Sequence, residues 1–480
     1  MKKILTYLFA FAILFVPIVC FADQPSAPPS GGQPGGTSST ASYSGATTFT
    51  EDTSKNSETY SSSTGSQNAL LVSRGNSTIT SCTINKSGDS SDENADFYGT
   101  NAAILVYNNG TLNISGGTIT TNAGHANAVF AYGTGTINIS DATITTKGNN
   151  SGGIMVTGGG TLTATNVTVT TDGNSSASIR SDRGGGTLTV SKGSYTTNGT
   201  GSPAIYSTAA ITVNDATLYA TKSEGVVIEG GNSVKLNNVV LTDDNTTLNG
   251  NSETYKNIFI YQSMSGDATE GSAEFDATGS NIATKNGDTI FVTNTTCTIN
   301  LTSNTITNDS GDFLRIQTGK WGNNGSNGGN VTLNLANQTV AGNIIVDNIS
   351  TLAMSMTAGS VYQGAIDNAN QAKKVTLSLA NDTVFVLTGD SYVDTLTNEN
   401  TDNSNIYLNG HKLYVNGSEV SANTGVYNGE SSLTNTTSTT STNNNILYLE
   451  IALVALVLII LIVVTIKIVK KKKNIVKWIS

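Results

Sequence analysis

Residues 110–121 read GTLNISGGTITT and residues 135–146 read GTINISDATITT, so one pattern returns after 25 residues. Two further copies follow at residues 160–171 (GTLTATNVTVTT) and 186–197 (GTLTVSKGSYTT). In each copy, one apolar position is followed seven residues later by a second. A fixed period of this size is the signature of a repeat architecture.

The same pair of positions continues on both sides of this stretch. From Leu112 to Val234 its first members follow one another at steps of 23–26 residues. The pair is found twelve times, from Ser77/Ile84 to Leu377/Val384. The ten pairs between these two are Leu112/Ile119, Ile137/Ile144, Leu162/Val169, Leu188/Tyr195, Ile211/Leu218, Val234/Leu241, Phe275/Ile282, Ile299/Ile306, Leu333/Val340 and Met354/Val361.

Each copy contains three short apolar runs, for example residues 128–131, 137–139 and 143–145. The runs are rich in β-branched residues and end at Gly, Asn or Asp, which is typical of strands and turns. Such a unit cannot bury its own apolar face, but parallel stacking of the units creates a continuous interior. An antiparallel sandwich is disfavoured because tight two-residue hairpin turns are not regularly placed. We therefore predict an all-β, single-stranded parallel β-helix over residues 61–390, with about twelve rungs of three strands.

The two ends carry membrane-targeting signals. Lys2 and Lys3, an apolar run and a small-residue site before Asp23 predict a signal peptide at residues 1–22. Residues 446–466 are apolar and long enough for one transmembrane helix. The lysine-rich tail, residues 467–480, is expected on the cytoplasmic side. These features predict a single-pass cell-membrane protein with an extracellular N-terminal region.

Three connecting segments complete the predicted organisation. Residues 23–60 are rich in Pro, Gly, Ser and Thr, which predicts a low-complexity linker. Residues 391–420 should form a C-terminal cap, since a solenoid exposes open strand edges at its ends. Within the cap, Asn409-Gly410 between two short apolar runs predicts a β-hairpin. Residues 421–445 read as a Ser/Thr/Asn stalk.

The charge and cysteine content exclude some functions. Residues 23–445 hold 33 acidic and 16 basic residues, a net charge of −17, which should repel nucleic acid. Cys82 and Cys297 lie on distant rungs, beyond the reach of a disulfide, and are expected to be buried thiols. His125 and His411 are also far apart, so a histidine-based acid–base pair or zinc site is not expected.

The copies GTLNISGGTITT and GTINISDATITT, with Asn/Gly-rich turns between them, resemble the repeats of bacterial adhesin-like parallel β-helix surface proteins, also called β-strand-repeat proteins. The resemblance covers residues 66–417. It implies a domain that contacts other cells, host glycans or matrix. Because β-helices also carry polysaccharide lyases and sugar-binding modules, these motifs indicate the fold and leave the ligand open.

One insertion, residues 319–329, is a candidate ligand-binding loop. Trp321 is flanked there by glycines, Asn323 and Asn324. An indole can stack on a sugar ring while amides bind its hydroxyls. The alternative is that the indole packs back over the solenoid.

Another insertion, the first along the chain, holds the densest acidic cluster, formed by Asp89, Asp92, Glu93 and Asp96. Several carboxylates on one loop can bind Ca²⁺, although the spacing matches no EF-hand. The alternative is a solvated loop. No other cofactor is expected.

A lyase would need a basic residue beside carboxylates, and Arg180, Asp182 and Arg183 are the best candidates. The alternative is a solvated turn with a local ion pair. Since the rungs are otherwise regular, we expect a non-enzymatic, adhesin-like protein that binds glycans or surface partners through loops on a β-helix scaffold. A polysaccharide lyase and a structural surface coat are the alternatives.

Overall fold

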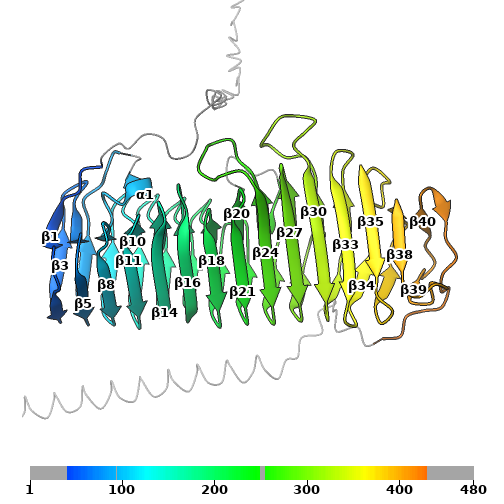
Figure 1. Ribbon diagram of the computed structural model, residues 1–480, viewed down its shortest axis with the longest axis horizontal. Helices are drawn as coiled ribbons and strands as arrows, with labels where there is room; N and C mark the ends of the chain where they lie inside the picture. Colours follow the sequence, from blue (N-terminus) through cyan, green and yellow to red (C-terminus); the bar gives the residue numbers. More distant parts are fainter. Residues whose placement is uncertain (1–40, 93–94, 249–253, 430–480) are drawn as a thin grey trace, which may run out of the picture. The chain divides into compact units, whose positions relative to one another are not determined.

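The computed structural model describes residues 41–92, 95–248 and 254–429. In these ranges the chain winds into a parallel β-solenoid of about 15 turns, with the strands of successive turns side by side (Figure 1). The predicted signal peptide, transmembrane helix, basic tail and most of the stalk lie outside the described residues. Among those that are described, no helix has the length and apolar character needed to cross a membrane.

The first strands of the first twelve turns form a 12-stranded parallel sheet, here called sheet A. Its inward residues are β-branched or leucine in almost every strand, which suits a buried pleated surface. Its strands are β1 (Gly45–Phe49), β4 (Asn68–Val72), β7 (Ile104–Val106), β10 (Val129–Tyr132), β13 (Ile154–Thr157), β15 (Ile179–Ser181), β17 (Ile205–Ser207), β20 (Val226–Glu229), β23 (Lys256–Tyr261), β26 (Asp288–Thr293), β29 (Leu314–Ile316) and β32 (Ile344–Val346).

The second and third strands form a 22-stranded sheet, sheet B. In two turns they run on as single strands, β14 (Gly160–Thr171) and β16 (Gly186–Thr197). The other second strands are β2 (Ser54–Asn56), β5 (Asn76–Thr80), β8 (Thr111–Ser115), β11 (Thr136–Ser140), β18 (Ala210–Asn214), β21 (Ser233–Asn237), β24 (Ser272–Thr278), β27 (Thr295–Thr302), β30 (Gly329–Ala336), β33 (Thr351–Thr357), β35 (Lys374–Leu379) and β38 (Thr395–Asn398). The other third strands are β3 (Thr59–Ser62), β6 (Thr83–Lys86), β9 (Thr118–Thr121), β12 (Thr143–Thr146), β19 (Thr217–Ala220), β22 (Val240–Asp243), β25 (Asn281–Thr284) and β28 (Thr305–Asn308).

The last third strands form a separate four-stranded sheet, sheet C, with β31 (Thr339–Ala341), β34 (Val361–Gly364), β36 (Val384–Leu387) and β39 (Ile406–Tyr407). Sheet D contains β37 (Ser391–Val393), β40 (Leu413–Val415) and β41 (Ser418–Glu419). The one short helix among the described residues, α1 (Ala95–Tyr98), lies in the first insertion.

The C-terminal end differs from the prediction. Asn409 and Gly410 do form a turn, with φ of 50° and 85°. However, β39 and β40 on its two sides do not pair with each other; β39 pairs in parallel with β36, and β40 with β37. The predicted hairpin is therefore wrong at this position, because the solenoid winding continues through it. The antiparallel hairpin comes one strand later, between β40 and β41.

The rung count and the linker boundary also change. About 15 turns replace the twelve predicted, since the solenoid extends beyond the regular pairs at both ends. At the N-terminal end, β1, β2 and the start of β3 lie within residues 23–60, so the second half of the predicted linker is part of the solenoid. The apolar pattern weakens in the first turn, where Lys55 stands in register with Ile79 of the second turn.

The interior is a single apolar core along the solenoid. Most paired positions of the repeat point inward; Leu112, Ile137 and Leu162, for example, are in register and fully buried. The second members of the last two predicted pairs are wrong by one residue, because Tyr362 and Phe385 are buried there in place of Val361 and Val384. Cys82 and Cys297 are buried free thiols, as predicted. Burial raises the pKa of the Cys297 thiol to about 12. Burying these side chains in turn after turn supplies the hydrophobic stabilisation that no single turn has.

The corner between the second and third strands explains the constant seven-residue offset. One residue there adopts a left-handed conformation that bends the chain sharply without a longer loop. Gly, Asn and Asp tolerate this conformation best, and they occupy most of these corners. Examples are Gly116 (φ 67°), Asp141 (54°), Asn166 (53°), Asp215 (52°) and Asn238 (54°).

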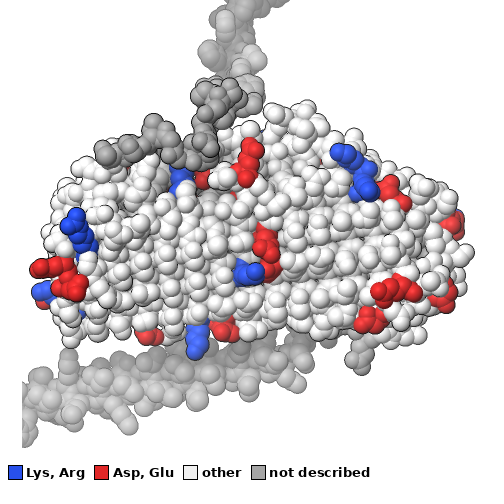
Figure 2. Space-filling view, in the orientation of Figure 1, with Lys and Arg blue, Asp and Glu red and all other residues white. Residues whose placement is uncertain are grey.

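The outer faces of the two large sheets differ in chemistry. On sheet B, Thr118, Thr143 and Thr168 stack in register and are exposed. Figure 2 shows one face of the molecule, where charged residues are few and scattered. On sheet A the outward residues are mostly apolar and covered. The longer loops and α1 lie along one edge of the solenoid in Figure 1.

Candidate functional site

The outward residues of sheet A form one continuous row of side chains along the solenoid, here called the file. Two stretches of this file are apolar clusters, and a charged and aromatic stretch separates them. The side chains of the file are buried or half-buried. The file is Leu71, Leu105, Phe130, Met155, Arg180, Tyr206, Val227, Phe259, Phe291, Arg315 and Ile345.

Trp321 belongs to the second of these clusters. Its ring lies 6.0 Å from that of Tyr261, and it packs against the cluster that also contains Phe259 and Phe291. The indole is half-buried. Packing over the solenoid, the alternative considered from the sequence, therefore describes its position. Its loop nevertheless lines the first of the two pockets described below.

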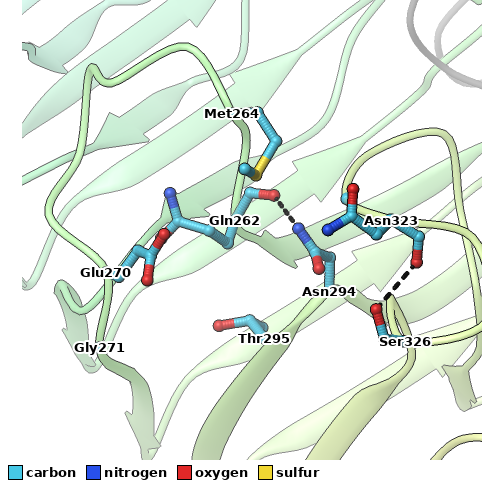
Figure 3. A pocket seen from close by; sticks show the side chains of 9 residues that line it. Gln262, Met264, Glu270, Gly271, Asn294, Thr295, Asn323 and Ser326 are labelled. Carbon is cyan, nitrogen blue, oxygen red and sulfur yellow. Dashed lines mark hydrogen bonds between the residues drawn. The ribbon is translucent and has the colours of Figure 1, made fainter. Parts of the chain in front are cut away.

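The first pocket, of about 320 Å³, lies between two loops over sheet A (Figure 3). The loop after β23 contributes Gln262, Met264 and Glu270 on one side. The loop before β30 contributes Asn323 and Ser326 on the other side. Asn294 and Thr295, where β26 passes into β27, lie between them. The lining is thus mainly amide and hydroxyl groups, with one carboxylate and one thioether.

Asn294 holds the two sides of this pocket together. Its side-chain Nδ2 donates to the carbonyl oxygen of Gln262 at 2.7 Å. Gly322 has φ of +82°, and a Cβ there would clash with the Asn294 amide. The close approach of the two loops thus requires glycine at this position.

The predicted ligand residues separate in the structure. Asn323 lines the first pocket, and its carbonyl oxygen accepts a hydrogen bond from the Ser326 hydroxyl at 3.1 Å. Asn324 is exposed and lies outside the pocket lining. Gln262, Glu270 and Asn294 were not predicted, because nothing in the sequence brings their segments to the Trp321 loop.

A second pocket, of about 210 Å³, lies over the charged stretch of the file. Arg180 Nη2 lies 2.9 Å from Asp182 Oδ2, so the predicted local ion pair exists. It is not solvated, since Asp182 is only 3% exposed. Burial raises the pKa of the Asp182 carboxyl to about 6, although the Arg180 guanidinium opposes this shift.

The guanidinium group of Arg183 contacts residues outside its own turn. Its Nε donates to Asp267 Oδ1 at 2.6 Å, across 84 residues of sequence. Its guanidinium carbon lies 3.7 Å from the centre of the Phe97 ring, on α1. The second pocket is therefore framed by the insertion that holds α1, by the loop after β23 and by the regular turns around β15 and β17, a meeting that sequence spacing could not reveal. Of the lining residues, the sequence analysis named only Arg180 and Asp182 and missed Phe97, Tyr206 and Asp267 among others.

A buried carboxylate, Glu229, fixes the loop that lies between the two pockets. It is 1% exposed and accepts hydrogen bonds from the hydroxyls of Tyr206 (2.5 Å), Tyr261 (2.8 Å) and Ser263. Ser263 belongs to the loop, whereas the two tyrosines belong to sheet A. Charge-assisted bonds of this kind are the stronger ones in proteins, so the loop is firmly attached.

The acidic cluster of the first insertion contacts protein groups. Asp89 Oδ1 accepts from the backbone N–H of Gly124 at 2.7 Å, and Asp96 Oδ2 lies 2.9 Å from His125 Nδ1. Both contacts attach the insertion to the next turn. Asp92 has a partner as well, and Glu93 lies outside the described residues. Within the described ranges no group of three or more acidic, His or Cys side chains is arranged to hold a metal. Binding of Ca²⁺ by this cluster stays a prediction.

Comparison with protein-family models, with curated proteins and with solved structures found no match to this chain. The fold and the two pockets are therefore the basis for any functional inference.

Proposed function

We propose that this chain is a membrane-anchored, extracellular glycan-binding protein of the adhesin type, in which the solenoid is a scaffold and the loops over sheet A bind the ligand. The observation that carries the proposal is the first pocket. Its volume of about 320 Å³ falls in the range of small-molecule sites. Its amide and hydroxyl lining matches the alternating donors and acceptors of a sugar.

The charge of the pocket narrows the ligand class. Glu270 is its one ionisable lining residue, and the predicted extracellular part has a net charge of −17. An anionic polysaccharide would therefore be repelled unless a cation bridged it to the protein. Neutral sugars are the class that fits.

The test compares two adjacent asparagines on one loop. The full-length chain, Asn323→Ala and Asn324→Ala would be applied to an array of neutral and acidic glycans, with Ca²⁺ and with chelator. Loss of the hydrogen bonds of one side chain costs about 1.4 kcal/mol, so Asn323→Ala should bind about tenfold more weakly. Asn324→Ala should bind like the unchanged chain, since Asn324 lies outside the pocket. Equal binding by both variants, or no binding by the unchanged chain, would refute the proposal.

A polysaccharide lyase is the second candidate, and the second pocket favours it. Arg180 and Asp182 lie together there, and the Asp182 pKa of about 6 is close to the range in which an acid–base group works well. Elimination would transfer the proton from the carbon beside the sugar carboxylate to a base in the site, break the glycosidic C–O bond and leave a C=C bond in one product. The departing oxygen takes up a proton and leaves as the hydroxyl of the other product. A steady rise in ultraviolet absorbance with pectin and Ca²⁺, absent in Asp182→Asn, would support this candidate.

A further inference from the structure

The two pockets share one wall. The loop that follows β23 supplies Gln262, Met264 and Glu270 to the first pocket and Asp267 to the second. A ligand that fills either pocket therefore lies against the same short segment of chain.

This shared wall is held from both sides. Below it, Glu229 binds Ser263 of the loop and Tyr206, which lines the second pocket. At its outer end, Asp267 pairs with Arg183. These contacts keep the two pockets at a constant separation, as a site for one rigid ligand requires.

The pockets also lie in one line. The second pocket lies over β15 and β17, through Arg180 and Tyr206, and the first lies beside the ends of β23 and β26. These pairs of strands are three turns apart in sheet A, roughly 14 Å at about 4.8 Å per turn. The line between the pockets therefore follows the solenoid axis.

The second pocket has the chemistry of a sugar subsite. Phe97, Ala177 and Pro203 contribute apolar groups to its lining, and Arg180 and Asp182 contribute polar ones. A sugar ring presents C–H groups on its faces and hydroxyls at its rim, so it can contact both kinds of group. Arg180 and Arg183 are each paired with a carboxylate, which leaves no net positive charge to select an anion.

We infer that the two pockets are subsites of one extended site that binds a linear neutral oligosaccharide lying along the solenoid axis. This inference rests on the proposed glycan-binding function and adds the shape and direction of the ligand. Binding at two linked subsites raises affinity without any new type of contact, because the second contact is made within one complex.

The test uses Trp321 as a reporter, because its neighbour Gly322 lines the first pocket. Full-length chain carrying Trp478→Phe would be titrated with the cello- and chito-oligosaccharide series, from monomer to long chains, while indole fluorescence is recorded. Affinity should rise with chain length until both pockets are filled and then stay constant.

Removing both charges of the Arg180–Asp182 pair leaves neither buried without its partner. The double variant Arg180→Gln/Asp182→Asn should bind long oligosaccharides about tenfold more weakly and short ones unchanged. Ser175→Asn, which adds bulk at a lining position whose φ of 52° suits asparagine, should do the same without removing a charge. The control Lys235→Gln/Asp276→Asn removes an ion pair of 2.8 Å on the outer face of sheet B, away from both pockets, and should change nothing.

The outcomes separate the two ideas. Binding without dependence on chain length, or an equal loss for all lengths in the pocket variants, would overturn the extended site and leave the glycan-binding function standing. No fluorescence change and no binding with any oligosaccharide would overturn both.

Discussion

Sheets A and B are built from the same repeat, yet their outer faces have different chemistry. The outer face of sheet B is mainly Thr, Asn and Ser, and in β9, β12 and β14 exposed threonines stack on one another. The outer face of sheet A holds buried aromatic residues, ion pairs and both pockets. The difference shows that the repeat fixes only the inward residues, and that the insertions determine what the outward residues become.

The largest expected effect concerns an ionisable residue inside sheet B. Asp243 is fully buried at an inward position where Thr146 and Thr171 stand in earlier turns. Burial, and secondly the nearby Glu224, raises its pKa from 3.8 to about 9. At about 1.4 kcal/mol per pKa unit, this rise corresponds to several kcal/mol of folding free energy. If sheet B serves only as a scaffold, replacing Asp243 by a neutral residue should raise the free energy of unfolding.

The direction of the pH dependence of stability follows from proton binding. Between about pH 4 and pH 9 the folded chain holds a proton at Asp243 that the unfolded chain has released, so stability falls as the pH rises. Asp243→Asn removes this dependence, and its advantage in urea unfolding should be small at pH 4 and large at pH 9. Asp215→Asn, at an exposed corner, is the control. An equal advantage at both pH values would contradict the assignment.

A smaller effect compares the two outer faces directly. Phe259 is 8% exposed and stacks on Tyr261 and Phe291, with ring centres 4.4 and 5.6 Å away. Phe259→Ala should lower the free energy of unfolding by about 3 kcal/mol, because it leaves a cavity under the loops. Thr145→Ala, on the outer face of sheet B, should cost about 0.5 kcal/mol or less. Guanidinium unfolding followed by circular dichroism measures both; similar costs would remove the distinction between the faces.

The smallest effect is local to the wall between the pockets. Glu229→Ala leaves the hydroxyls of Tyr206, Tyr261 and Ser263 without their acceptor and should cost about 2 kcal/mol. Amide hydrogen exchange should accelerate in residues 262–271 and stay unchanged in the Thr-rich strands of sheet B. Glu274→Ala, a glutamate on the outer face of sheet B, is the matched control. Unchanged exchange in the loop would show that Glu229 does not hold it.

The sequence predicted the features that repeat. Inward positions such as Leu112 and Ile119 recur because every turn faces the same core, and this periodicity was enough for the β-helix and its three strands per turn. The end turns were missed because the apolar periodicity weakens there. Lys55 replaces an apolar residue in the first turn, and the corner between β38 and β39 is longer than the two-residue corners of the regular turns.

The site was predicted only in part. The Trp321 loop was visible as an insertion, and Asn323 does line a pocket. The rest depends on contacts between distant segments, such as Arg183 with Asp267 and Glu229 with Ser263. No periodicity encodes these contacts, since each involves residues that occur once.

The left-handed corner between the second and third strands has a consequence for how such a protein changes over time. Through the regular part of the solenoid this corner keeps a constant length, whereas the longer insertions enter at the two corners that flank sheet A. Mutations that lengthen or replace those loops leave the register of the core untouched. Recognition and folding can thus evolve separately, and loops exchanged between turns would offer a route to engineered specificity on an unchanged backbone.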